Sequence, residues 1–251
     1  MTRVHARVRV AAWGLLALAV SAPTHGEDRF RLELEGGAAW QSRNDFAIPG
    51  GTGTRVDLAA IESGPVAALR GTLTWHVGER WSLRLLAAPL RLETSFTPDA
   101  PIDFDGATFA AREAVAARYR FDSYRLSGIY RFRPRGRWSF RAGFTAKIRA
   151  AEIGIDSRTA SESYSNVGFV PLLHGAVRLQ VAEKLALELE ADAMAAPQGR
   201  AEDVALKAHL PLSGGASVNL GYRLVEGGAD VDKVYTFAFL HYAVAGLAVR
   251  F

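Results

Sequence analysis

Histidine and serine are the residues of this chain that are best suited to nucleophilic catalysis, because an imidazole can accept the proton of a serine hydroxyl. On a β-strand, a Ser two residues after a His would share its face. The residues at that spacing carry no hydroxyl: Gly78 after His76, Ala176 after His174, Pro211 after His209 and Ala243 after His241. No Asp directly precedes a His either. We therefore expect no catalytic residues and no enzymatic activity.

Carboxylates cluster in two segments that are rich in turn-forming residues, PDAPIDFDGATF at 98–109 and EGGADVDK at 226–233. Neither segment has the spacing of a twelve-residue calcium loop. The chain contains no cysteine, which excludes disulfides and a thiolate-bound metal. We expect solvated loops at both segments, no metal site and no cofactor.

Charged residues recur at every second position of several segments. In RFRLELEGGAAW, which starts at Arg29, one face carries Phe30 and Leu32 while the other carries charges. This alternation is typical of β-strands with one apolar and one polar face. The charged faces are expected to carry Arg29, Arg31, Glu33, Glu35, Arg70, Arg84, Arg118, Arg120, Arg141, Lys147, Arg149, His174, Arg178, Glu188, Glu190, Asp192, Lys207 and His209.

Ten alternating runs follow one another along the chain. They cover about 29–40, 67–76, 81–94, 113–132, 138–149, 167–181, 185–192, 204–210, 218–224 and 234–251. A soluble β-sandwich would show the same alternation, but most of these runs reach the roughly 9 to 11 residues that a tilted membrane strand needs. The expected fold is an all-β, antiparallel, up-and-down transmembrane barrel of about ten strands, with eight or twelve as alternatives.

The alternation changes phase in two of the runs, near Pro89 and near Asp122. A β-bulge is the natural cause, and a proline that cannot donate a hydrogen bond favours one. With these bulges, Leu90 and Tyr119 belong to the apolar outer face of the barrel.

Short and long connections alternate between the runs. The connections at 77–80, 133–137, 182–184 and 211–216 are short, whereas those at 42–64, 96–112, 156–166, 196–203 and 226–233 are longer. Membrane barrels combine short periplasmic turns with longer outer loops in this way. Aromatic residues lie at the strand ends beside the short turns and predict an interfacial girdle: Trp75, Trp81, Phe132 and Trp138.

The N-terminal residues predict a secretion signal. Arg3, Arg7 and Arg9 precede an apolar run of 11 residues, Val10 to Val20, which is too short to cross a bilayer as a helix, and small residues follow it. We expect a signal peptide at 1–26 and a barrel at 27–251. Loss of those three arginines lowers the net charge from +4 to +1, which argues against a nucleic-acid partner.

The C-terminal stretch FLHYAVAGLAVRF ends in Phe251, with Val249 and Leu247 on the same face. It resembles the last strand of Gram-negative outer-membrane proteins, which the barrel-assembly machinery recognises. The chain also resembles a group of uncharacterised small outer-membrane barrels through SYRLSGIYRF, GFTAKIRAAEIGI, GFVPLLH and EGGADVDKVYTFAFLHYAV. The resemblance implies an outer-membrane location, with lipid, lipopolysaccharide and the assembly machinery as partners. It implies no activity and leaves the oligomeric state open.

The charged lumen permits two interpretations. Long side chains of both signs can pair across a narrow barrel and fill it, whereas an excess of Arg and Lys would form a constriction for small anionic solutes. The filled lumen is our first interpretation, and His174 and His209 then have structural roles. The expected function is a non-enzymatic structural or surface-interaction role in the envelope, with a narrow pore and, less favoured, a lipid-modifying enzyme as alternatives.

Overall fold

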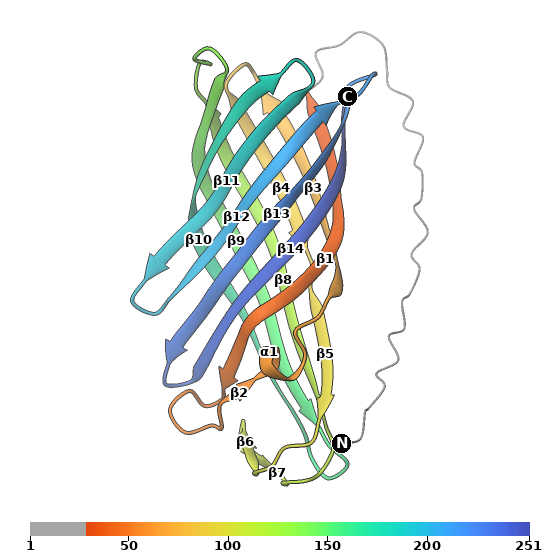
Figure 1. The fold of residues 1–251 in the computed structure, drawn as a ribbon. Coiled ribbons are helices and arrows are strands. Elements are labelled where there is room, and N and C mark those ends of the chain that lie inside the picture. Colours follow the sequence, from red (N-terminus) through yellow and green to blue (C-terminus); the bar gives the residue numbers. More distant parts are fainter. Residues whose placement is uncertain (1–28) are drawn as a thin grey trace.

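Alternating polar and apolar residues form long antiparallel strands that close into a barrel (Figure 1). The computed structural model describes residues 29–251, so the expected signal peptide lies outside the described residues. The barrel strands are β1 Phe30–Ala47, β3 Val66–Val77, β4 Trp81–Ala88, β5 Arg91–Phe96, β8 Val115–Arg131, β9 Trp138–Asp156, β10 Ser161–Ala182, β11 Leu185–Ala196, β12 Gly199–Pro211, β13 Ala216–Val231 and β14 Val234–Arg250. Shorter elements are β2 Val56–Asp57, α1 Leu58–Ile61, β6 Ile102–Phe104 and β7 Ala107–Phe109.

The barrel has ten strands, which confirms the expected fold. β4 and β5 both pair with β8 and together form one barrel strand, and β2 is a two-residue addition to β1. Pairing of β14 with β1 closes the sheet, so that no barrel strand is left with a free edge. At the seam, the backbone N–H of Phe251 donates to the Phe30 carbonyl at 2.9 Å, and the Phe30 N–H donates to the Phe251 carbonyl at 2.8 Å.

Large apolar side chains cover the outer surface of the barrel. Phe144 is 72% exposed and Phe169 is 65% exposed. A surface of this kind is stable against lipid rather than water. No helix among residues 29–251 is long and apolar enough to cross a bilayer.

Three of the five connections at the end opposite the short turns are much shorter than expected. β9 and β10 are 19 and 22 residues long, and only residues 157–160 separate them. Residues 197–198 and 232–233 are the other two tight connections, in place of the expected 196–203 and 226–233. At this end the outer face of a strand becomes polar and the inner face apolar, as with the buried Ile153 and Ile155 of β9, so the pattern of a lipid-facing strand is lost although the backbone ladder continues. The predicted strand ends were therefore wrong on this side.

The two predicted bulges are absent from the pairing of β4, β5 and β8. Ala88 pairs with Ser123 and Arg91 with Arg120, so the register is the same on both sides of Pro89. Pro89 only interrupts the hydrogen bonding. What changes at this level is the character of the barrel interior, which is charged on one side and apolar on the other.

An apolar plug fills the barrel at the end opposite the short turns. Inward residues of the strands meet Leu58 of α1 and the β6–β7 hairpin, which lie at this end in Figure 1. Phe46 packs edge-on against Phe104, with 5.6 Å between the ring centres. We define the apolar plug as Phe46, Ile48, Leu58, Leu90, Leu92, Ile102, Phe104, Phe109, Val115, Ala117, Tyr119, Ile153, Ile155, Val225 and Leu240, all of them buried.

The plug corrects two expectations. Leu90 and Tyr119 point into the barrel and not toward lipid. Segment 98–109 is not a fully solvated loop, because Ile102, Phe104 and Phe109 are buried in the plug.

Substitution Phe104→Ala tests the packing of the plug. Because Phe104 is buried against Phe46, we expect a loss of about 3 to 5 kcal/mol in the free energy of unfolding, measured by denaturant titration of the barrel in lipid vesicles. Thr108→Ala, at an exposed position of the same hairpin, is the control; it removes one surface hydrogen bond to Asp103 and should change the free energy of unfolding by about 1 kcal/mol or less. Equal stability of the two variants would contradict the plug.

Deletion of Phe251 tests the seam. The deletion removes both backbone hydrogen bonds to Phe30 and the stacking of the two rings, whose centres lie 5.9 Å apart. We expect a severalfold lower yield of folded protein in outer membranes, measured by heat-modifiable migration on gels. Phe132→Ala removes an exposed aromatic ring away from the seam and should keep the normal yield. A normal yield of the Phe251 deletion would argue against an assembly role for this residue.

Candidate functional site: the charged lumen

Acidic and basic side chains from nearly every barrel strand meet in the half of the lumen between the apolar plug and the short turns. The strands place them there because every second residue points inward. Those of the expected set that lie in this layer are Arg31, Glu33, Glu35, Arg70, Arg84, Arg141, His174, Arg178, Glu188, Glu190, Asp192, Lys207 and His209. We call this layer the charged network.

Arg125 is the centre of the charged network, with a side chain that is only 1% exposed. Its guanidinium donates to Asp192 at 2.9 Å and to Asp203 at 2.7 Å. Asp192 also accepts hydrogen bonds from Thr145 at 3.0 Å and lies 2.9 Å from the ring of His174. One cation thus joins two buried carboxylates across the barrel, and each carboxylate has further partners.

Asp203 connects this centre to the seam side of the barrel. It accepts from Arg70 at 2.9 Å and from Arg223 at 2.6 Å. Arg223 in turn donates to Glu35 at 3.0 Å, and Lys207 donates to Glu35 at 2.6 Å. The ion pairs therefore run without a break from β8 to β1.

A third group of charges lies toward the short turns. Arg84 donates to Glu190 at 2.9 Å, and Arg141 pairs with Glu188 at 2.9 Å. Arg178 and His209 lie 3.7 and 3.8 Å from Glu188. Neither ring nitrogen of His209 has a hydrogen-bond partner among the described residues, and His174 bonds to Asp192 through Nδ1, so the structural role of these imidazoles stays a prediction.

Several expected members lie at the margins of the network. Arg29 is exposed at the rim before β1. Lys147 is buried at the boundary with the apolar plug, with its ammonium 5.0 Å from the centre of the Phe121 ring. Arg149 follows on the same inner face and donates to Asn166 at 2.6 Å.

Arg118 and Arg120 do not belong to the lumen, contrary to expectation. The Arg118 side chain is 51% exposed and pairs with Asp156, and Arg120 pairs with Glu152. Without a bulge near Asp122, the apolar neighbours of these arginines face the plug, so the arginines point outward.

Three central residues were not in the expected set. Arg125 and Arg223 are on the charged faces of their predicted strands, so the alternation was sufficient to include them. Asp203 was assigned to the connection 196–203, whereas the structure places it within β12. Because the predicted strand began only at residue 204, Asp203 was not assigned to either face of the barrel wall.

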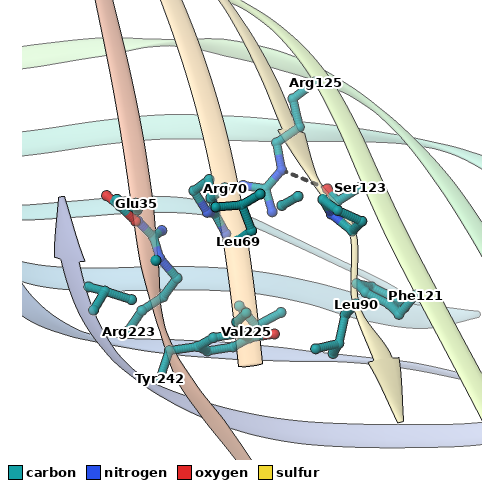
Figure 2. A pocket seen from close by; sticks show the side chains of 15 residues that line it. Glu35, Leu69, Arg70, Leu90, Phe121, Ser123, Arg125, Arg223, Val225 and Tyr242 are labelled. Atoms are coloured by element: carbon teal, nitrogen blue, oxygen red, sulfur yellow. Dashed lines mark hydrogen bonds and ion pairs between the residues drawn. The ribbon is translucent and has the colours of Figure 1, made fainter. Parts of the chain in front are cut away.

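Two small cavities lie in the lumen. One of about 30 Å³ lies at the boundary of the two layers, where Figure 2 shows Glu35, Arg70 and Arg125 beside the apolar Leu90 and Phe121. Another, of about 120 Å³, lies in the charged network and is lined by the cross-strand pair His76 and Ser82, whose Nδ1 and Oγ are 2.9 Å apart. These volumes hold no more than a few water molecules. Among residues 29–251, no group of three His, Asp or Glu residues has the geometry of a metal site.

Aromatic side chains surround the end that carries the short turns. Trp75, Trp81, Phe132 and Trp138 are all exposed on the outer face there. Phe30 stacks on Trp75 with ring centres 6.3 Å apart, and on Phe251 on its other side. The arrangement is typical of an interfacial belt.

Comparison with known proteins gives similarity of fold only. Neither a protein-family model nor a curated protein matches the sequence. The outer membrane protease OmpT of Escherichia coli is similar in structure, with a TM-score of 0.55 and 11% identity over 92% of this chain and 99% of that chain. The attachment invasion locus protein Ail of Yersinia pestis, solved with the heparin analogue sucrose octasulfate, has a TM-score of 0.42 and 10% identity, with 89% of this chain and 99% of its own covered. Neisserial surface protein A has a TM-score of 0.35 and 12% identity, with coverages of 88% and 97%.

The location of the protein follows from its surface and its fold together. A closed ten-stranded barrel with an apolar outer face and an aromatic belt is stable in a bilayer, and OmpT shares this fold at full length. The chain is therefore an integral outer-membrane β-barrel of the kind found in Gram-negative bacteria.

Proposed function

We propose that this protein is a closed, non-conducting barrel with a structural or surface-interaction role in the cell envelope. The observation that carries the proposal is the filling of the lumen by two successive layers, the charged network and the apolar plug. A solute entering from either end meets paired ions or packed hydrocarbon.

Pairing within the charged network argues against an anion-selective pore. Basic residues outnumber acidic ones, but each of these cations lies within 4 Å of a carboxylate of the network: Arg31, Arg70, Arg84, Arg125, Arg141, Arg178, Lys207 and Arg223, which pair with Glu33, Glu35, Glu188, Glu190, Asp192 and Asp203. Rings of one sign select ions of the other sign, whereas buried charges that are already paired with each other do not form such a ring. The cavity of about 120 Å³ lies among these pairs, on the short-turn side of the apolar plug.

The outer ends of the longest strands are the surface that this function would use. β8, β9 and β10 continue well beyond the span of about 9 to 11 residues that the bilayer requires. Their outer faces carry Arg118 and Arg120, which suit the phosphate groups of lipopolysaccharide. Lipopolysaccharide and outer-membrane lipid are the proposed partners there, and the assembly machinery is the proposed partner of the terminal strand.

Planar-bilayer recording separates the closed barrel from the pore. We expect flat current traces for the purified protein over a range of voltages and salt concentrations, because both layers block the lumen. A porin inserted under the same conditions serves as the positive control. Discrete conductance steps from the folded protein would contradict the proposal.

Substitution Arg125→Met tests the charged network as the filling of the barrel. Removal of this cation leaves Asp192 and Asp203 short of a partner, so we expect a loss of about 3 to 5 kcal/mol in the free energy of unfolding in lipid vesicles. Arg118→Met, the matched substitution on the outer face, should cost less than about 1 kcal/mol. A similar small cost at both positions would show that the lumen is solvated and open.

A further inference from the structure

Three polar side chains form a hydrogen-bonded chain on the lipid-facing side of the barrel. The Oγ of Ser42 lies 2.8 Å from Nε2 of His241, and Nδ1 of the same imidazole contacts the hydroxyl of Tyr222. The Ser42 hydroxyl also lies 3.4 Å from the Phe239 carbonyl oxygen. All of these contacts are exposed, and none of them is part of the charged network in the lumen.

A β-bulge brings the serine to the histidine. Along the seam Gln41 pairs with Leu240 and Arg43 with Phe239, so Ser42 is an extra residue on β1 that has no partner on β14. Bulges re-aim side chains and are frequent beside active sites. Here the extra residue directs the Ser42 hydroxyl to the side of the sheet where His241 lies.

Aromatic rings hold the imidazole in place. Trp40, the direct cross-strand partner of His241, stacks on it with ring centres 5.7 Å apart and an angle of 13°. Phe239 packs edge-on from the other side at 4.9 Å. Both ring nitrogens therefore point along fixed directions, one toward Ser42 and one toward Tyr222.

The hydrogen-bonded side chains of Ser42, His241 and Tyr222 lie at the outer edge of the hydrocarbon layer. His241 is ten residues before Phe251, which belongs to the aromatic belt beside the short turns. A tilted strand crosses the bilayer in about 9 to 11 residues, so His241 is at the opposite interface. Ester bonds of lipids lie at this depth, between the acyl chains and the head groups.

Arginine side chains lie next to these three residues, on the side away from the short turns. The guanidinium of Arg43 is 4.5 Å from the centre of the Phe237 ring, that of Arg200 is 5.0 Å from the same ring, and that of Arg55 is 4.3 Å from the Tyr235 ring. Arg43 and Arg55 pair with Asp45, and Arg200 pairs with Glu226. These arginine side chains are 41%, 56% and 45% exposed, and because exposed ion pairs are weak, the guanidinium groups can also contact phosphate groups at a membrane surface. A lipid with a phosphate near these arginines would place its ester bonds near Ser42.

We propose that Ser42 and His241 are a catalytic pair that hydrolyses fatty-acyl esters of phosphate-bearing lipids in the outer leaflet, with Tyr222 as a positioning residue. The activity goes beyond the proposed function of the closed barrel and needs no open lumen. The proposal also revises the expectation that the protein is not an enzyme, because that expectation considered only Ser and His residues on the same strand.

The reaction is an acyl transfer to serine followed by hydrolysis. The Nδ1–H of His241 donates a hydrogen bond to the Tyr222 oxygen and keeps its proton, so that the unprotonated Nε2 accepts the Ser42 proton as Oγ attacks the ester carbonyl. The ester C–O bond then breaks, and the leaving alcohol takes that proton from Nε2. Water attacks the acyl-serine, its proton passes through Nε2 back to Oγ, and the fatty acid is released.

The test uses the full barrel, purified and folded in detergent, with a fluorophosphonate probe and two lipids. One arm presents vesicles of phosphatidylethanolamine and phosphatidylglycerol, and the other presents purified lipopolysaccharide. We expect the probe to label Ser42 and mass spectrometry to detect free fatty acid in at least one arm, and the arm that reacts identifies the lipid class. No label on Ser42 together with no fatty acid in either arm would overturn the proposal.

Variants assign the roles. Ser42→Ala should lose the label and at least about 100-fold in rate, as expected for loss of a nucleophile. Ser165→Ala, on the outer face without a histidine, and Ser82→Ala, in the lumen beside His76, should retain both. Tyr222→Phe should lower kcat with little change in KM, because it frees the imidazole without touching the lipid. Heat-modifiable migration verifies the folding of each variant, and unchanged activity of folded Ser42→Ala would overturn the proposal.

Discussion

Closure of the sheet between β1 and β14 is the constraint on which the rest of the structure depends. In a bilayer, each backbone N–H and C=O without a partner costs several kcal/mol, so an open edge is excluded. The register from Arg31 with Arg250 to Ala47 with Tyr235 satisfies both edges along the whole seam. A closed barrel of ten strands then encloses a narrow interior that must be filled or hydrated.

Two layers fill this interior, one after the other along the barrel axis: the charged network and the apolar plug. Within the membrane the inward residues are ionised and arranged so that each carboxylate meets at least one cation, as Asp192 and Asp203 do on Arg125. Beyond Pro89 and Asp122 the inward residues are mostly apolar, with Gln41 and Asn44 as buried polar exceptions, and they pack on segments from outside the sheet, including Leu58 and Phe104. Ion pairs between strands fill the interior within the membrane, whereas a hairpin and a short helix contribute side chains to the filling at the other end.

The seam also creates the most unusual feature of the outer face. An extra residue in β1 keeps the ladder closed on both sides of Ser42 while its side chain is turned toward His241. Hydrophobic rings around the imidazole leave its two nitrogens as the polar atoms that a lipid would meet. A rigid, closed barrel suits such a site, because strands hold side chains more precisely than loops do.

The sequence by itself determined the fold class, the number of barrel strands and most inward charges, because contrast between apolar and charged faces is strong wherever lipid covers one side. It was sufficient for Arg84, Glu188 and Lys207, and for the aromatic residues at the short turns. Only the tertiary structure decided whether Leu90, Tyr119 and Arg118 point into or out of the barrel. An apolar face that packs on lipid and one that packs on the plug give the same alternating sequence pattern. The tertiary structure alone also joined Ser42 to His241, because their contact depends on the pairing of the first strand with the last and on a bulge that leaves no trace in residue type.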